Sequence, residues 1–372
     1  MRYDRPIQFN RNPITSSRPL RKLGRNLFWS LGVPVVLTLV ALILSGIAET
    51  KLFLVPGNTL STIKRMMIFV NSIVCTLIAA LALNSNLNSG RMDFSLGATG
   101  ILATVISSKF IPDFADAGLV TFQGIIIFTI LTIIFGMILG LIHSLIFIVL
   151  KLPPIVTSLG MCLVFEGVAK VLVGHNTQIL IRPSAITSNL FLEPIIIIPM
   201  LIILVLIMSL IFCYSRYGYE KNALVYDQKI SVDTGIKEVR NCIVCFVMAG
   251  ALIGLYQAID VTTTSMIQVK VNLGSSGTVF KNFLPIFIGS IIAAYSNQIV
   301  GLTLAIFSTV MLSTGMNAAT SIGFSDDIQS LITGFGVFAV LVYKVDKYKF
   351  INWVKKQAYL LKLKRLGLKE EK

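Results

Sequence analysis

Ten long apolar runs constrain the fold of this chain more than any other feature. A helix needs about 20 apolar residues to cross the hydrocarbon core of a bilayer, and most of the runs approach or exceed that length. Three are shorter, and short or interrupted runs are typical of broken helices that line a transport pathway. An ordinary span with polar neighbours at the interface is the alternative. The expected spans cover residues 27–48, 66–83, 94–108, 119–150, 154–174, 195–214, 241–259, 283–295, 299–316 and 328–343.

The composition agrees with a membrane-embedded chain. Hydrophobic residues make up 55% and charged residues only 13%, whereas soluble domains are about 45–50% apolar and about 25% charged. The sequence therefore predicts an all-α polytopic transmembrane helical bundle of about ten spanning helices. A possible internal pseudo-repeat would relate spans two to five to spans seven to ten, each half containing a short segment.

The positive charge is distributed as in a multi-pass membrane protein. With the N-terminus inside, 24 of the 32 Lys and Arg residues fall in cytoplasmic segments and 7 in outside segments, as the positive-inside rule requires. This charge flanks spans and forms no single basic face, so nucleic acid is not expected as a partner. We expect a basic cytoplasmic segment 1–26, a transmembrane domain 27–343 and a basic cytoplasmic tail 344–372, in a bacterial plasma membrane.

A polar stretch between the second and third runs is a candidate gate. Asp93 is placed to act as the N-cap of the following helix. Gly90 precedes it in a flexible loop, and the small residues Ser95 and Gly97 allow close helix approach. An ordinary capped span with a small-residue packing face is the alternative.

Polar residues inside the other spans are further pathway candidates. Glu166 and Lys170 are spaced i, i+4, so they can pair along one helix face, either beside the pathway or near the outer interface. Asn71 and Asn317 can hydrogen-bond a polar solute or bridge two helices.

The loop 215–240 is the longest predicted cytoplasmic loop. Its pattern predicts one short surface helix between Gly218 and Gly235, with glycine suited to the C′ position. A short exposed helix there can dock a partner. The residues that we expect to transmit force from that partner are Tyr226, Asp227, Ser231, Thr234 and Gly235.

The sequence contains no motif for nucleotide binding or catalysis. It has no G-x-x-x-x-G-K-[ST] phosphate loop, no H-E-x-x-H motif and no histidine spacing typical of a metal site. We therefore expect neither an enzyme nor a bound metal or cofactor. A transporter of this kind uses an ion gradient or takes its energy from a partner.

Three segments resemble known sequences. Ser89-Gly-Arg-Met-Asp-Phe-Ser-Leu-Gly-Ala is similar to the G-x-I-D-L-S-V-G-A/S segment of ribose-type ABC permeases. Lys151-Leu-Pro-Pro-Ile-Val-Thr-Ser-Leu-Gly is similar to their K-L-P-P-F-I-V-T-L-G segment, which opens a later span. Residues 216–236 resemble their cytoplasmic coupling loop, although Val225-Tyr226 and Ile230-Ser231 replace the usual Gly-Gly and Ala-Ala pairs.

The resemblance implies the permease subunit of an ABC importer. Its partners would be cytoplasmic ATPase subunits that use ATP, an extracytoplasmic solute-binding protein, and a second permease, identical or related, all within membrane lipid. The implied solute is a monosaccharide, with a nucleoside or an autoinducer-2-like compound as the alternative. A gradient-driven secondary transporter remains as a different class, in which Asp93 and Glu166 would be the ion sites.

Overall fold

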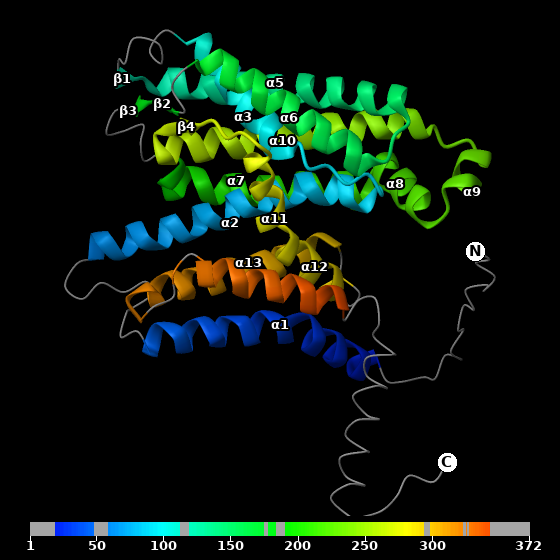
Figure 1. Ribbon diagram of the computed structural model, residues 1–372. Helices are drawn as coiled ribbons and strands as arrows, with labels where there is room; N and C mark the ends of the chain where they lie inside the picture. Colours follow the sequence, from blue (N-terminus) through cyan, green and yellow to red (C-terminus); the bar gives the residue numbers. More distant parts are fainter. Residues whose placement is uncertain are drawn as a thin grey trace, which may run out of the picture.

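The computed structural model describes residues 19–47, 59–111, 119–174, 178–183, 190–293, 298–322, 325 and 327–342. Within these ranges the chain is an all-α bundle of roughly parallel and antiparallel helices (Figure 1). The long helices are α1 (Pro19–Ile47), α2 (Thr59–Asn88), α5 (Phe122–Leu150), α6 (Pro154–Val173), α7 (Pro194–Ser209), α10 (Glu238–Thr264) and α13 (Gln298–Ala318). A π-helical turn, η2 (Leu210–Tyr214), extends α7.

Shorter elements complete the bundle. The short helices are α3 (Leu96–Lys109), α8 (Arg216–Tyr226), α9 (Gln228–Asp233), α11 (Gly277–Lys281), α12 (Phe283–Ile292) and a last helix, Asp327–Val342. Single 3-10 turns are η1 (Leu190–Leu192), η3 (Gly274–Ser276) and η4 (Ala319–Ile322). At one end β1 (Leu119–Val120) pairs in parallel with β3 (Arg182–Pro183), and β2 (Gln178–Leu180) pairs antiparallel with β4 (Met266–Gln268).

Seven of the described helices, counting α7 with η2, are long and apolar enough to cross a membrane, and Asp327–Val342 is a shorter apolar helix. The three runs expected to be short are the three short apolar helices. At 1.5 Å per residue, the 14 residues of α3 reach only about 21 Å, less than the hydrocarbon thickness of about 30 Å. The chain is thus a multi-pass helical bundle in which α3 and α12 do not cross by themselves.

The surface of the bundle supports a membrane environment. Isoleucines recur along one face of α5 with exposed side chains, including Ile126, Ile130, Ile134 and Ile138. Val35, Val36 and Leu39 are equally exposed on α1. A water-soluble protein rarely exposes apolar patches of this extent, so lipid is the natural neighbour of these faces.

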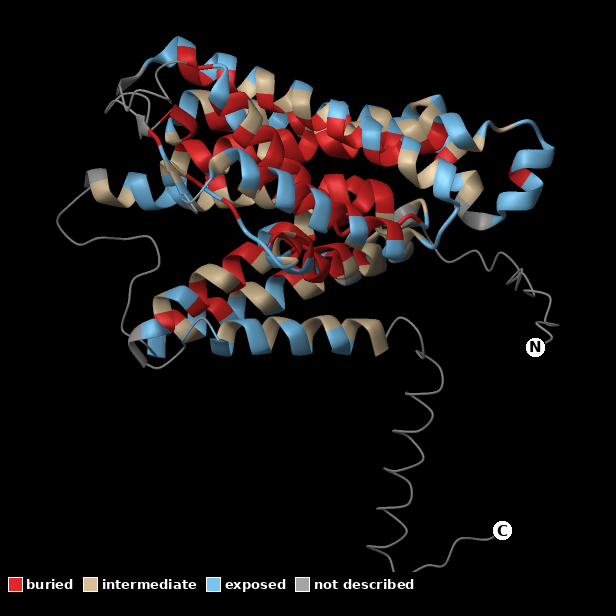
Figure 2. Cartoon of the chain, turned by 45° about the horizontal axis from the view of Figure 1, so that its top comes forward, coloured by how far each residue is buried: buried red, intermediate tan, exposed pale blue. Residues whose placement is uncertain are grey.

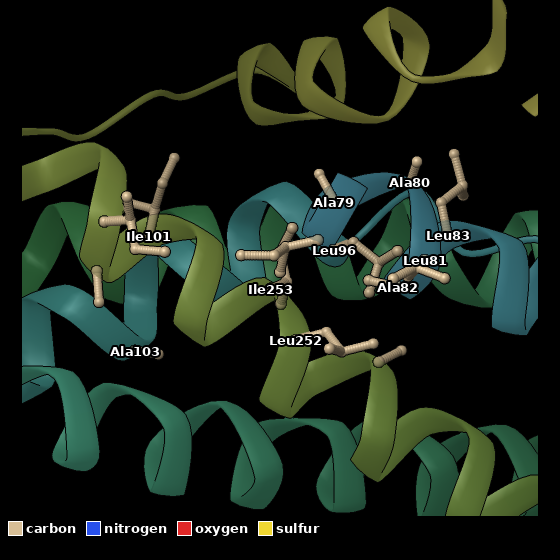
Figure 3. Packing of buried hydrophobic residues seen from close by; sticks show 14 of the residues in the cluster. Ala79, Ala80, Leu81, Ala82, Leu83, Leu96, Ile101, Ala103, Leu252 and Ile253 are labelled. Atoms are coloured by element: carbon tan, nitrogen blue, oxygen red, sulfur yellow. The ribbon is translucent and has the colours of Figure 1, made fainter. Parts of the chain in front are cut away.

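Buried residues gather in the middle of the bundle (Figure 2), and α2, α3 and α10 contribute many of them. Only Ile106 and Lys109 of α3 are not buried. Figure 3 shows aliphatic residues from α2, α3 and α10, among them Leu81, Leu96 and Ile253, packed together. Because neighbouring elements enclose α3 on nearly all sides, its sequence has no separate polar and apolar faces.

Helices α5 and α10 pack through facing glycines. A Cβ atom at Gly136 would lie 2.3 Å from the carbonyl oxygen of Gly250, and one at Gly140 would lie 2.4 Å from that of Phe246. Gly254 approaches the backbone of Thr132 equally closely. Small residues spaced four apart on both helices bring the backbones together, which drives helix association where no hydrophobic effect operates between helices.

Candidate functional site

The chain turns back into the bundle after α2 through an extended segment that leads to α3, and we call residues 90–97 the first re-entrant segment. Gly90 has a φ of +71°, which turns the chain. Asp93 is then buried, with 1% of its surface exposed. Its Oδ1 accepts hydrogen bonds from the backbone N–H of Ser95 at 2.8 Å and from the Ser95 hydroxyl at 2.7 Å. The N-cap residue of α3 is Ser95 and not Asp93 as expected. Asp93 lies two residues before the N-cap and stabilises the helix start by accepting hydrogen bonds from Ser95.

His143 joins this segment to α5. Its Nδ1 lies 3.0 Å from the Ser95 hydroxyl and 3.4 Å from Oδ2 of Asp93. Because the Ser95 hydroxyl donates to Asp93, the His143 Nδ1 carries the hydrogen in this contact. Asn86 of α2 donates to the same Oδ2 at 3.3 Å. The Asp93 carboxylate therefore ties α2, α3 and α5 together through contacts from each of them.

The chain turns back a second time after α10, and we call residues 269–277 the second re-entrant segment. After β4 the chain passes through Asn272 and Leu273, both with left-handed backbones at φ +58° and +64°. Glu166 of α6 then accepts the backbone N–H of Leu273 at 2.9 Å and that of Ser275 at 2.8 Å. Both oxygens of the Glu166 side chain thus hold a distant backbone turn.

The first and second re-entrant segments touch each other. A Cβ atom at Gly97 would lie 2.1 Å from the carbonyl oxygen of Ser275, so only glycine fits there. Beside this contact the ring of Phe94 packs against Phe280 and Phe283, with ring centroids 5.5 Å and 6.4 Å apart. Of the predicted gate residues, Gly97 makes this contact and Glu166 holds the second segment. Asp93 and Ser95 lie shortly before Gly97 in the first segment, and Gly90 is the exposed turn that opens it.

Asn71 and Asn317 lie elsewhere. Asn71 donates to the carbonyl oxygen of Phe191 at 3.3 Å and accepts from the Cys75 thiol at 3.0 Å, so it bridges α2 to η1. Asn317 is exposed in the last turn of α13. The structure gives Asn71 the helix-bridging role and does not bring either residue to the re-entrant segments.

Sequence reasoning missed two partners of the re-entrant segments. Asn86 belongs to a polar stretch in which no residue stands out, and Ser275 belongs to a Gly-Ser-Ser-Gly run, residues 274–277, that matches no motif. The small residues of that run were the available signal, because they permit the close approach that Gly97 makes. Among the described residues, no group of three or more His, Cys, Asp or Glu side chains is arranged to hold a metal ion.

The segment 215–235, which we call the arm, projects beyond the end of the bundle (Figure 1). It forms two helices instead of the single expected one, because Asp227 interrupts it. The Asp227 Oδ1 accepts the backbone N–H of Ile230 at 3.0 Å and so starts α9. Gly235, at φ +92°, ends the turn that follows α9.

The arm exposes apolar surface. Ile230 is 61% exposed and Val232 is 44% exposed. Next to them lies an open groove of about 650 Å³ at the start of α10. The groove is lined by Val232, Ile236, Lys237, Glu238, Val239, Arg240, Ile243 and Val244.

The other expected force-transmitting residues of the arm shape its helices. Ser231 is buried, and its hydroxyl donates to the carbonyl oxygen of Asp227 at 2.7 Å. The Thr234 hydroxyl donates to the carbonyl oxygen of Ser231 at 2.8 Å. Ser231 and Thr234 thus stabilise α9, and Tyr226 is the last residue of α8.

Comparisons with known proteins add no identification, since no family model, no curated protein and no solved structure matches the chain. What the fold itself defines is a multi-pass helical membrane protein, compatible with a transporter, that contains two interrupted elements meeting inside the bundle.

Proposed function

We propose that the chain is the permease subunit of an ABC importer that moves a small polar solute, with a monosaccharide as the first expectation. The observation that carries the proposal is the arm, where Ile230 and Val232 expose apolar side chains beside an open, largely apolar groove. Exposed apolar surface rimmed by polar residues is typical of protein docking sites. Because the sequence has no phosphate loop of its own, the expected occupant is an ATPase subunit.

Two of the three resemblances support this interpretation. The motif at residues 89–98 coincides with the first re-entrant segment, and the motif at residues 151–160 opens α6, the helix that carries Glu166. Interrupted helices near the centre of the bundle are how transporters place backbone groups beside a pathway. The residues proposed for the gate are therefore Asp93, Ser95 and Gly97, together with Gly90 as the turn.

A chain of contacts links the arm to the gate. The Tyr217 hydroxyl of α8 lies 3.2 Å from that of Ser85. The neighbouring Asn86 accepts from the Cys245 thiol of α10 at 2.9 Å and donates to Asp93. Motion of the arm and of the start of α10 would thus reach the first re-entrant segment through packed side chains. A measured energetic coupling between the arm and Asp93 is the test of this path.

Docking is tested by co-purification of this chain with a co-expressed candidate ABC ATPase subunit. The double substitution Ile230→Ser with Val232→Ser should lower ATPase recovery and coupled ATP hydrolysis at least tenfold, which corresponds to about 1.4 kcal/mol of binding free energy. Leu180→Ser is the matched control, since Leu180 is 64% exposed on β2. Unchanged recovery in the double variant would refute the docking assignment.

The rival class is a gradient-driven transporter. It would need a carboxylate that takes up and releases an ion, yet both carboxylate candidates, Asp93 and Glu166, already accept hydrogen bonds at both oxygens. Uptake measured in vesicles decides between the classes. Transport that proceeds with this chain alone and collapses with an uncoupler would favour the rival, whereas transport that requires ATP and the ATPase supports our proposal.

A further inference from the structure

Three buried side chains near the arm carry donors that no described residue accepts. They are Lys221 Nζ on α8, Arg91 Nη1 after α2, and Asn241 Nδ2 on α10, where the Asn241 Oδ1 also lacks a partner. Lys221 has 0% of its surface exposed, Arg91 6% and Asn241 2%. Buried donors are almost always paired with protein, water or a ligand, and an unpaired one costs about 1–3 kcal/mol or more.

Contacts made by Arg91 and by residues one helical turn from Asn241 and Lys221 place the three residues around one region. Arg91 Nη2 lies 3.4 Å from Oε1 of Glu238, which is less than one turn before Asn241 on α10. One turn beyond Asn241, Cys245 contacts the α2 end at Ser85. Ser85 also contacts Tyr217, which lies one turn before Lys221. The set therefore lines the meeting point of α2, α8 and α10.

The charges in this region do not balance. Glu238 is the carboxylate that Arg91 contacts, and its side chain is 37% exposed and also accepts from Gln228 at 2.7 Å. The Lys221 ammonium lies 4.4 Å from the centre of the Phe212 ring, a cation–π contact that offsets only part of the lost hydration. Burial lowers the pKa of Lys221 to about 8, so at neutral pH most of the population still carries the charge.

We propose that a phosphate-type oxyanion binds between Arg91, Lys221 and Asn241. A tetrahedral oxyanion accepts hydrogen bonds from several directions at once, as a guanidinium, an ammonium and an amide would supply here. The region lies at the ends of the candidate spans Ser61–Leu87, Pro194–Tyr214 and Glu238–Thr264, and the ends of spanning helices meet the headgroup layer of a bilayer. The oxyanion is therefore inorganic phosphate or the headgroup of an acidic lipid. The partly exposed Glu238 marks the open side of the site.

This inference does not depend on the proposed transport function. It uses none of the docking residues Ile230 and Val232 and, although Arg91 lies in the first re-entrant segment, none of the gate residues Asp93 and Gly97. Glu238 lines the docking groove as well, so it is left unchanged in the test. The two proposals can fail separately.

The test uses the full chain, purified without phosphate or added lipid. Sodium phosphate, titrated against sodium chloride at matched ionic strength, should raise the Tm by about 3 °C or more at saturation. Lys221→Met and Arg91→Gln should abolish this rise. Lys229→Gln is the matched control, because it removes an exposed lysine of the arm and should leave the rise intact.

Lys221→Met is informative even before an anion is added. Replacing a buried, unpaired ammonium by an apolar side chain of similar length should raise the Tm in phosphate-free buffer, so a loss of the phosphate response will not reflect misfolding. Lipid nanodiscs separate the two sources. A higher Tm in phosphatidylglycerol discs than in phosphatidylcholine discs identifies the lipid headgroup as the ligand. A Tm that rises only with free phosphate identifies the inorganic ion.

Two results would overturn the proposal. One is a wild-type protein whose Tm responds neither to phosphate nor to the acidic lipid. The other is a rise in Tm that Lys229→Gln diminishes as much as Lys221→Met does, because the phosphate effect would then be general screening of a basic surface.

Discussion

The first and second re-entrant segments solve the same physical problem in different ways. In both, the chain leaves helical geometry inside an apolar bundle, where unpaired backbone groups are expensive. The first segment carries its own carboxylate, Asp93, which is held by the side chains of Asn86, Ser95 and His143. The second segment takes its carboxylate, Glu166, from α6.

The difference lies in what each carboxylate holds. Asp93 accepts one backbone N–H and otherwise contacts side chains, which can change rotamer without unfolding the segment. Glu166 accepts two backbone N–H groups, so its removal leaves the turn at Leu273 and Ser275 without acceptors. The comparison predicts that the second re-entrant segment is the more rigid and the first the more adjustable, which suits a gate at Asp93.

The contact between the re-entrant segments should give the largest effect. Gly97→Ala places a methyl group 2.1 Å from the backbone oxygen of Ser275. Since backbone on both sides must shift, we expect a loss of about 3 kcal/mol or more, seen as a collapse in the yield of monodisperse protein. Gly167→Ala on α6, where nothing lies within 4 Å, is the control and should be neutral or slightly stabilising. Similar yields for both variants would mean that the segments do not touch.

Removing the Glu166 carboxylate, which α6 supplies, should have the second-largest effect on stability. Glu166→Gln keeps the shape but replaces one accepting oxygen by an amide that faces a backbone N–H. We expect a loss of about 2–3 kcal/mol in the free energy of unfolding, measured by denaturant titration in detergent. Glu193→Gln provides the comparison, because Glu193 is not buried and caps no helix through its side chain. An equal, small effect at both positions would contradict the capping role.

The sequence predicted the elements better than their contacts. The ten apolar runs mark ten helices, and the three short runs are the three short apolar helices, because both follow from local hydrophobicity and length. The helix break at Asp227 escaped prediction, since its side chain competes with helix continuation by capturing the N–H of Ile230. Helix α10 also runs five residues beyond the expected end at Ile259.

Roles of the candidate residues were predictable only where the cause is local. The turn at Gly90 and the helix start near Asp93 could be predicted from adjacent residues. The role of Glu166 could not, because its partners Leu273 and Ser275 are 107 and 109 positions away. Local spacing showed only Lys170, one turn along the same helix, and no periodicity encodes a contact with a distant backbone turn.

A double-mutant cycle sharpens the contrast between the re-entrant segments. Asp93→Asn and His143→Gln act on one shared contact, so their effects on the free energy of unfolding should fall short of additivity by about 1–2 kcal/mol. His143→Gln combined with Glu166→Gln changes two segments through residues that share no partner, and these effects should add within about 0.5 kcal/mol. Additivity in the first cycle would remove His143 from the network.

The left-handed turns give the smallest and most selective test. Gly90, at φ +71°, has nothing within 4 Å of the position that an added methyl group would take, so Gly90→Ala should cost only the backbone penalty of about 1 kcal/mol. In the second re-entrant segment the exposed Asn272 already adopts φ +58°, which asparagine tolerates, and Asn272→Gly should stay within about 0.5 kcal/mol of the wild type. Gly90→Asn should recover part of the loss caused by alanine, because asparagine adopts this backbone conformation more readily. If alanine and asparagine behave alike at position 90, the turn of the first re-entrant segment does not depend on a left-handed backbone there, in contrast to the turn at Asn272.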